Sequence, residues 1–211
     1  MSEFVTTPSP EPSTSPSPQK KESVFSFLFD YLEILVFSAC AVLLIFTLFG
    51  RLCKVNGSSM RNTLFHEEML ITTSLVTPKA GDIIVFHQTS ETNPRLNEPL
   101  VKRIIATEGQ TVRIDYTRGE VYVDGVLLSE PYVALLDQRG VDIGRWTQIP
   151  TYGYDRSTGI FEATVPEGCY FVMGDNRNNS LDSRSAEVGF VDARRVLGKV
   201  IIRTQPWTVY E

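Results

Sequence analysis

Cysteine and histidine are scarce in this chain, and their scarcity limits the chemistry that it can perform. The 211 residues include three cysteines and two histidines. Cys40, Cys53 and Cys169 are too few and too scattered for a disulfide framework or a zinc site, and their number allows at most one bridge, Cys53 to Cys169. His66 and His87 do not stand at metal-ligand spacing from each other or from a cysteine. We therefore expect neither a metal nor another cofactor.

Positive charge is also in the minority. Lys and Arg together number 20 against 25 Asp and Glu, which gives a formal net charge of −5. A broad nucleic-acid-binding surface requires an excess of basic residues, so this composition argues against nucleic acid as a partner. The remaining composition, 42% hydrophobic and 21% charged, is that of an ordinary globular protein. The length suits one domain or two small ones.

The N-terminal part of the chain contains two segments of opposite character. Residues 6–18 consist of Pro, Ser and Thr with a single Glu, and they offer no apolar surface that could offset the entropy cost of ordering. We predict a disordered tail over residues 1–22. The 17 residues from Ile34 to Gly50 carry no charge, and a helix that begins some residues earlier is long enough to cross a bilayer. We predict an interfacial turn and one transmembrane helix over residues 23–51.

Two other interpretations of this helix are weaker. A helix of a soluble core is usually shorter and has a polar side, and here polarity is confined to a stripe of Ser26, Asp30 and Glu33, which is typical of the membrane interface. A cleaved signal peptide would end at small residues, whereas Arg51 to Lys54 follow here. Basic residues flank both ends, so charge alone does not orient the helix.

Residues 52–211 predict a mostly β domain. Stretches rich in β-branched and aromatic residues predict strands at 81–86, 100–107, 111–116, 169–173 and 196–203. In the stretch 120–128, Asp124-Gly125 stands between two apolar runs and predicts a two-residue hairpin turn. Residues 129–165 are rich in turn residues, and we expect them to form an excursion from the main sheet.

A pair of serines follows the predicted membrane helix directly. Asn56-Gly57 indicates a turn that presents Ser58 and Ser59. A serine becomes a nucleophile only when a base accepts its proton. Both histidines lie in polar surroundings that indicate the protein surface, so the remaining candidate base is a lysine with a lowered pKa.

Lys102 is the lysine that fits this role. If residues 100–107 form a strand, Lys102 shares a face with Leu100 and Ile104, and burial between them would lower its pKa. About 0.04% of an ordinary lysine is neutral at pH 7, and a pKa lowered by roughly three makes a usable base. The alternative is a lysine whose stem lies on the strand while its amine reaches water. Periodicity alone leaves both interpretations open.

Residues 174–184, which we name the polar loop, form the third candidate. Only one of these eleven residues is apolar, and the others must satisfy many hydrogen-bonding groups. Asp175, Asp182 and Arg184 predict a buried network of ion pairs. A phosphate-binding loop is a poorer interpretation, because the second glycine and the lysine of that motif are absent.

These motifs, taken in order, resemble those of the bacterial-type type I signal peptidases, which are membrane-bound serine–lysine endopeptidases. The resemblance extends over residues 31–203. It comprises the apolar helix, Gly57-Ser58-Ser59-Met60 with Thr63-Leu64, the stretch 81–86, Val101-Lys102-Arg103-Ile104 and the polar loop. Each motif is weak alone, but their order after a membrane helix is highly specific. The resemblance implies an antiparallel β-sheet catalytic domain behind a single N-terminal transmembrane helix.

The resemblance also implies roles for individual residues. Ser59 matches the nucleophile, Lys102 the general base, and Ser180 a hydroxyl that orients the lysine amine. The remaining matches comprise a supporting network of Asp175, Asp182 and Arg184, and small apolar substrate pockets lined by Met60, Leu64, Leu100 and Val101. Two positions depart from the family pattern: Asn62 replaces a usual proline, and Gly57 replaces a serine found in some members.

The implied function is the removal of N-terminal signal peptides from exported preproteins after a small residue, through an acyl-enzyme and without a cofactor. The implied location is the cell membrane, crossed once, with a cytoplasmic N-terminus and an extracytoplasmic catalytic domain. The lipid bilayer and signal peptides would be the partners.

Two other functions remain: a membrane-anchored β binding module without catalysis, and a self-cleaving repressor-type peptidase. The latter would need a DNA-binding domain, which residues 1–30 cannot form.

Overall fold

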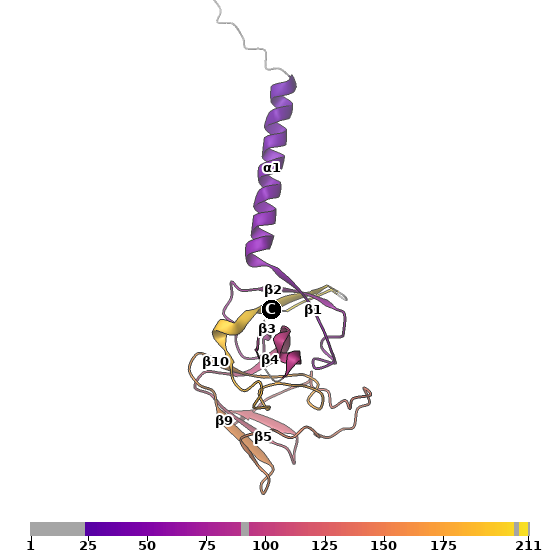
Figure 1. Cartoon of the computed structure of the whole chain (residues 1–211), viewed down its shortest axis with the longest axis vertical. Coiled ribbons are helices and arrows are strands. Elements are labelled where there is room, and N and C mark those ends of the chain that lie inside the picture. Colours follow the sequence, from indigo (N-terminus) through magenta and orange to yellow (C-terminus); the bar gives the residue numbers. More distant parts are fainter. Residues whose placement is uncertain (1–23, 90–92, 205–206, 211) are drawn as a thin grey trace, which may run out of the picture. The chain divides into compact units, whose positions relative to one another are not determined.

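The computed structural model describes residues 24–89, 93–204 and 207–210 (Figure 1). The predicted disordered tail, residues 1–22, lies outside the described residues. The chain divides into two compact units, one ending at Leu43 and the other beginning at Leu44.

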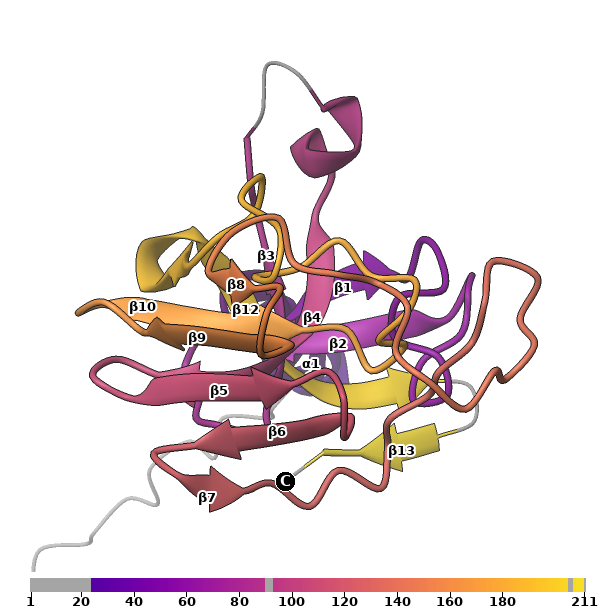
Figure 2. The same cartoon turned by 90° about the horizontal axis from the view of Figure 1, so that it is seen from below.

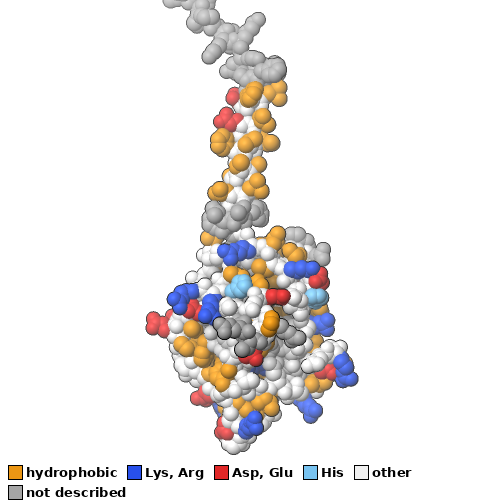
Figure 3. All heavy atoms as spheres, viewed as in Figure 1, with side chains coloured by type: hydrophobic (Ala, Val, Ile, Leu, Met, Phe, Trp, Pro, Cys, Tyr) orange, Lys and Arg blue, Asp and Glu red, His pale blue; other side chains and the backbone are white. Residues whose placement is uncertain are grey.

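The N-terminal element is one continuous helix, α1 (Val24–Phe49). No break separates the acidic residues near its start from the apolar stretch that follows. Its window Phe27–Leu44 has a mean hydropathy of 2.1, and none of this window is buried within the protein. Figure 3 shows hydrophobic side chains along the visible face of α1. By length and composition α1 can cross a membrane, and no second such helix occurs among the described residues.

The second unit contains two antiparallel sheets (Figure 2). In spatial order the larger sheet contains β1 (Arg51–Lys54), β2 (Met69–Thr73), β12 (Val196–Thr204), β3 (Ile83–Phe86), β4 (Leu100–Thr107), β10 (Cys169–Met173) and β11 (Val191–Asp192), and β13 (Trp207–Val209) pairs with β12. The smaller sheet contains β7 (Val126–Leu127), β6 (Glu120–Val123), β5 (Thr111–Asp115), β9 (Ile160–Thr164) and β8 (Tyr154–Asp155). Two short 3-10 helices, η1 (Pro94–Asn97) and η2 (Ala193–Arg195), lie between strands of the larger sheet.

The strand predictions are confirmed. The stretches 100–107 and 169–173 coincide with β4 and β10, the stretches 81–86 and 111–116 contain β3 and β5, and β12 extends one residue beyond the stretch 196–203. The predicted hairpin joins β6 to β7: Asp124 and Gly125 have φ of 50° and 81°, and a two-residue turn with both central residues at positive φ matches the twist of the paired strands. The mostly β, antiparallel fold class is therefore correct.

The segment 129–165 differs from its predicted form in one respect. Its last part contains β8 and β9, and β9 pairs with β5 along its whole length. Only residues 129–153, which we name the connecting segment, leave the two sheets. The alternation in β9, where Phe161 is buried and Glu162 is exposed, is the period-2 pattern of a half-buried strand, but it is too short to be recognised among the surrounding turn residues.

Three hydrophobic clusters stabilise the second unit, and β4 contributes residues to all three from the interior of the larger sheet. The largest joins the two sheets through Phe161 and Phe171, whose ring centroids are 5.6 Å apart. β4 lies between β3 and β10, so both of its edges are hydrogen-bonded to neighbours. Side chains on a strand held in this way have well-defined positions, which matters for Lys102 and Arg103.

Candidate active site

Ser59 lies in a turn that is tied to two other parts of the fold. Hydrogen bonds between Val55 and residues 67 and 68 hold the start of this turn beside the beginning of β2. The backbone oxygen of Ser59 accepts a hydrogen bond of 3.0 Å from the backbone N–H of Asn176 in the polar loop. The turn is therefore docked onto the polar loop, and the position of Ser59 depends on both.

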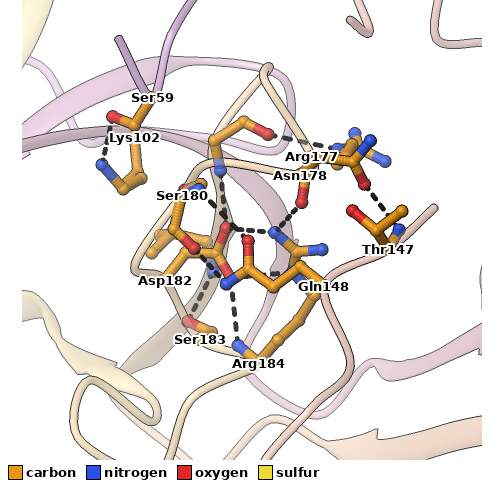
Figure 4. A network of polar contacts seen from close by, with 12 residues as sticks. Ser59, Lys102, Thr147, Gln148, Arg177, Asn178, Ser180, Asp182, Ser183 and Arg184 are labelled. Atoms are coloured by element: carbon orange, nitrogen blue, oxygen red, sulfur yellow. Dashed lines mark hydrogen bonds and ion pairs between the residues drawn. The ribbon is translucent and has the colours of Figure 1, made fainter. Parts of the chain in front are cut away.

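The side chains of Ser59 and Lys102 meet directly (Figure 4). Lys102 Nζ lies 2.7 Å from Ser59 Oγ and 2.9 Å from the backbone oxygen of Val101. The Lys102 side chain is buried, with 3% of the residue exposed. The interpretation in which its amine reaches water does not apply to this structure.

Burial sets the acidity of the Lys102 amine. Desolvation lowers the pKa of Lys102 to about 8, although the nearby carboxylates of Asp182 and Asp175 act in the opposite direction. With this pKa about 10% of the amine is neutral at pH 7, which is far more than for an ordinary lysine. A neutral amine at hydrogen-bonding distance from a serine hydroxyl can accept its proton.

The polar loop contains two separate ion pairs where the sequence predicted one network. Arg184 binds Asp182 through Nε and Nη2 at 2.9 and 2.8 Å, and Asp182 also accepts a hydrogen bond from the backbone N–H of Gly174. Burial alone would raise the pKa of the Asp182 carboxyl, but Arg184 outweighs burial and lowers it. This carboxylate is therefore ionised, and its charge lies near Lys102.

The partner of Asp175 is Arg103, which sequence reasoning missed. Arg103 Nε and Nη2 lie 2.9 and 2.7 Å from the two carboxylate oxygens of Asp175, and the Thr63 hydroxyl donates to the same carboxylate. Because Arg103 follows Lys102 on a strand, its side chain is on the opposite face of β4. The strand thus presents one cation to Ser59 and the next to the base of the polar loop.

The connecting segment supplies a third buried ion pair to the polar loop. Glu130 accepts hydrogen bonds of 3.0 and 2.6 Å from the Arg177 guanidinium, whose side chain is fully buried. Trp146 stacks against the guanidinium groups of Arg177 and Arg184 at 5.2 and 5.5 Å from the ring centroid. The segment has no periodicity that could have indicated these contacts in the sequence.

Ser180 is buried beside the same site, with 4% of the residue exposed. Its hydroxyl oxygen has no hydrogen-bond partner of normal geometry among the described residues, so the predicted contact with Lys102 is not formed in this conformation. Because Gly174 has no side chain, Ser180 and Ser59 can both lie close to its backbone. A Cβ on this residue would lie 2.2 Å from Ser180 Oγ and 2.5 Å from the backbone oxygen of Ser59. Ser180 and Ser59 therefore approach the backbone at Gly174 from the same side.

A cleft of about 720 Å³ opens beside Ser59. Its lining comprises Asn56, Gly57, Ser58, Ser59, Asn93, Pro94, Glu98, Pro99, Leu100, Asn179, Leu181 and Glu187. Of the four predicted substrate-binding residues, only Leu100 lines this cleft. Met60 and Leu64 are 2% and 0% exposed and pack in a core cluster together with the partly buried Val101, so neighbouring side chains would have to move before a substrate could touch Met60 or Leu64.

The two histidines lie at the surface, as expected. His66 is exposed, and its Nδ1 accepts a hydrogen bond of 3.2 Å from the backbone N–H of Gly57. His87 is also exposed at the end of β3. Among the described contacts, neither histidine touches Ser59.

Comparison with known proteins gives a consistent result. The family model described as "Signal peptidase, peptidase S26" matches residues 28–207. Signal peptidase I of Bacillus caldolyticus is 38% identical over 157 residues, which is 72% of this chain and 78% of that protein. Signal peptidase I of Bacillus licheniformis is 34% identical over 186 residues, which is 85% of this chain and 90% of that protein. A crystal structure of a signal peptidase I from Enterococcus faecalis V583 is 36% identical and covers 60% of this chain and 98% of its own, with a TM-score of 0.41.

Proposed function

This chain belongs to the signal peptidase family, peptidase S26, and we propose that Ser59 is its nucleophile and Lys102 its general base. The protein is a serine endopeptidase that removes signal peptides from exported preproteins. The observation that carries the assignment of the two residues is the 2.7 Å hydrogen bond between Ser59 Oγ and the Nζ atom of a buried lysine.

The reaction begins with a proton transfer from Ser59 to Lys102. Neutral Lys102 accepts the hydroxyl proton while Ser59 Oγ forms a bond to the scissile carbonyl carbon. The Ser59 backbone N–H contributes to stabilising the negative charge on the carbonyl oxygen. Protonated Lys102 then gives its proton to the leaving amine as the peptide bond breaks, which leaves an acyl-enzyme. Lys102 next takes a proton from water, whose oxygen attacks the acyl carbon. Lys102 returns this proton to Ser59 Oγ as the bond between Oγ and the acyl carbon breaks, which regenerates the enzyme. No metal or other cofactor takes part.

The surrounding residues hold this pair in place. The Asp182–Arg184 and Asp175–Arg103 ion pairs keep the polar loop and β4 in fixed positions, and Ser180 orients the lysine amine once its hydroxyl turns toward it. Leu100 contacts the substrate in the cleft. Met60, Leu64 and Val101 form the apolar floor behind it and reach the substrate only after the floor opens.

The helix α1 associates the enzyme with a membrane, and we propose a single-pass topology. The tail, residues 1–22, is cytoplasmic, residues 23–51 interact with the lipid bilayer, and the catalytic domain, residues 52–211, lies on the extracytoplasmic face where signal peptides emerge. Support comes from the length and hydropathy of α1, and the resemblance to the type I signal peptidases implies a membrane-bound enzyme. Confinement to the same surface raises the effective concentration of substrate without any new contact.

Substitution of the two reacting residues tests this proposal. Detergent-solubilised protein is mixed with a preprotein, and the parent is compared with Ser59→Ala, Lys102→Ala and Lys79→Ala, the last being an exposed lysine that serves as a matched control. We expect losses of at least about 1,000-fold in kcat for Ser59→Ala and Lys102→Ala, because nucleophile and base act as a unit, and parental activity for Lys79→Ala. Processing at the parental rate by both active-site variants would refute the assignment. Binding of preprotein without cleavage by the parent would instead favour the non-catalytic β module.

A further inference from the structure

Gln148 in the connecting segment binds both backbone groups of Ser180. Its side-chain Nε2 donates to the Ser180 carbonyl oxygen at 2.5 Å, and its Oε1 accepts from the Ser180 N–H at 3.2 Å (Figure 4). The carboxamide thus pairs with Ser180 as a neighbouring strand would. Two bonds to one residue fix the peptide planes on both of its sides, and the χ1 rotation of the Ser180 side chain is the freedom that remains.

The Gln148 contact belongs to a seam between the connecting segment and the polar loop. Asn178 accepts a hydrogen bond of 2.7 Å from the Thr147 backbone N–H and donates one of 2.9 Å to the Arg145 carbonyl oxygen. Tyr152 donates its hydroxyl proton to the Ser183 carbonyl oxygen at 2.5 Å. Contacts on either side of Ser180 therefore hold the shape of the polar loop, and Gln148 acts on Ser180 itself.

The contact between Gln148 and the Ser180 backbone fixes the position from which the Ser180 hydroxyl rotates. This hydroxyl is buried, and among the described residues it has no hydrogen-bond partner of normal geometry. It lies against Gly174 on the side where Gly174 also faces Ser59. The hydroxyl lies close enough to the Asp182 carboxylate to lower the pKa of that group. Rotation about χ1 allows the hydroxyl to turn from Asp182 toward another partner when the site is occupied. Lys102, which already binds Ser59, retains further hydrogen-bonding capacity at Nζ.

We propose that Gln148 is a positioning residue of this peptidase: it holds the Ser180 peptide so that the Ser180 hydroxyl can orient the Lys102 amine. The proposal rests on the proposed function, because it assigns Gln148 a role that acts through Ser180. It also gives the connecting segment a purpose beyond covering the polar loop. Gln148 does not touch the substrate cleft, so its effect falls on the proton transfer and not on substrate binding.

A double-mutant cycle separates this role from a merely structural one. kcat and KM for a preprotein are measured for the parent, Gln148→Ala, Ser180→Ala and the double variant, below the unfolding temperature of each. We expect Gln148→Ala to lower kcat about ten-fold with KM unchanged within about two-fold, since a small misplacement of a reacting group can cost as much as about 100-fold. The double variant should have the kcat of Ser180→Ala, because Gln148 no longer positions a reacting group once the Ser180 hydroxyl is removed.

Two further variants complete the experiment. Gln148→Glu keeps the size of the side chain and an acceptor for the Ser180 N–H but loses the donor to its carbonyl oxygen, so its kcat should also fall while its unfolding temperature stays near that of the parent. Ile149→Ala removes an exposed side chain from the same segment, and it should have parental kcat.

Two results would overturn the proposal. One is a double variant whose fold-loss in kcat equals the product of the losses of the two single variants. This result would indicate a general loosening of the loop. The other is a Ser180→Ala variant with full activity. Neither result affects the Ser59–Lys102 assignment, which fails only if Ser59→Ala and Lys102→Ala remain active.

Discussion

At the scale of single residues, Lys102 illustrates how burial converts a cation into a base. Its pKa of about 8 lies well below that of a lysine in water, 10.5. The unfolded chain therefore binds a proton at this site up to a higher pH than the folded chain does. Between these two values unfolding takes up a proton, so stability rises with pH. At neutral pH the burial of Lys102 costs on the order of 3 kcal/mol of folding free energy, which is the stability given up for a reactive amine.

The pH dependence of activity follows from this pKa. We expect kcat/KM to rise with pH through an acid limb centred near pH 8, because only the neutral amine accepts the Ser59 proton. At pH 6 about 1% of Lys102 is neutral, so kcat/KM should be on the order of 1% of its plateau. The measurement is cleavage of a soluble peptide between pH 5 and pH 10. Equal activity at pH 6 and pH 9 is incompatible with a lysine base.

The position of Gly174 accepts only glycine because its surroundings leave no room for a side chain. Its φ is not in the left-handed region, so the need for glycine here comes from the close approach of Ser180 and Ser59 and not from backbone conformation. No side chain larger than hydrogen fits between them without displacing the loop.

At the scale of elements, the connecting segment and the polar loop depend on each other. Residues 129–153 contain no helix or strand, yet they provide Glu130, Trp146 and Gln148 to the loop that lies beside Lys102. Segments without secondary structure can still be rigid when their polar groups are bonded to buried partners. The support of the site therefore comes from an irregular segment as well as from strands.

The Glu130–Arg177 pair provides a test of this dependence. Glu130→Ala leaves the fully buried Arg177 guanidinium without its carboxylate, and we expect the free energy of unfolding to fall by about 3–5 kcal/mol, as for other broken buried pairs. The measurement is denaturant unfolding in detergent, with Arg194→Ala as the control. Arg194 pairs with Asp192 at the surface, where its side chain is 90% exposed, and its removal should leave stability unchanged. Equal effects of the two substitutions would show that the buried pair does not stabilise the loop.

At the scale of the whole molecule, α1 and the β domain have separate tasks. All three hydrophobic clusters are built from residues after position 52, and no residue in the apolar window of α1 is buried within the protein. The β domain thus contains its own core, and the chemistry of Ser59 and Lys102 depends on contacts within that domain.

Removal of residues 1–50 should therefore slow the cleavage of a membrane-embedded preprotein but not the cleavage of a soluble peptide. We expect the truncated chain to cleave a soluble peptide with the kcat/KM of the full chain. We expect it to cleave a preprotein embedded in lipid vesicles at least about 100-fold more slowly, because it loses the effective concentration that shared attachment to one surface provides. The measurement compares both chains on both substrates at equal enzyme concentration. If truncation slows both substrates equally, α1 contributes to the catalytic domain itself and not only to localisation.

Much of the fold and of the proposed site could be predicted from local patterns. The hydropathy of residues 34–50, the β-branched strands, the Asp124-Gly125 turn and the serine and lysine motifs all depend on properties of neighbouring residues, which a sequence displays directly. The scarcity of histidine and cysteine, visible before any motif, also narrowed the choice of base to a lysine.

Only the tertiary structure decided whether the Lys102 amine is buried or reaches water. Alternation along β4 places Lys102 and Arg103 on opposite faces but does not show that both faces are buried, because burial depends on what packs against the strand from distant parts of the chain. The same reason hid the partners of the polar loop: Arg103 lies 72 residues from Asp175, Glu130 lies 47 residues from Arg177, and Gln148 lies 32 residues from Ser180. Chemical type is local and is written in the sequence, whereas desolvation and pairing are properties of the folded chain.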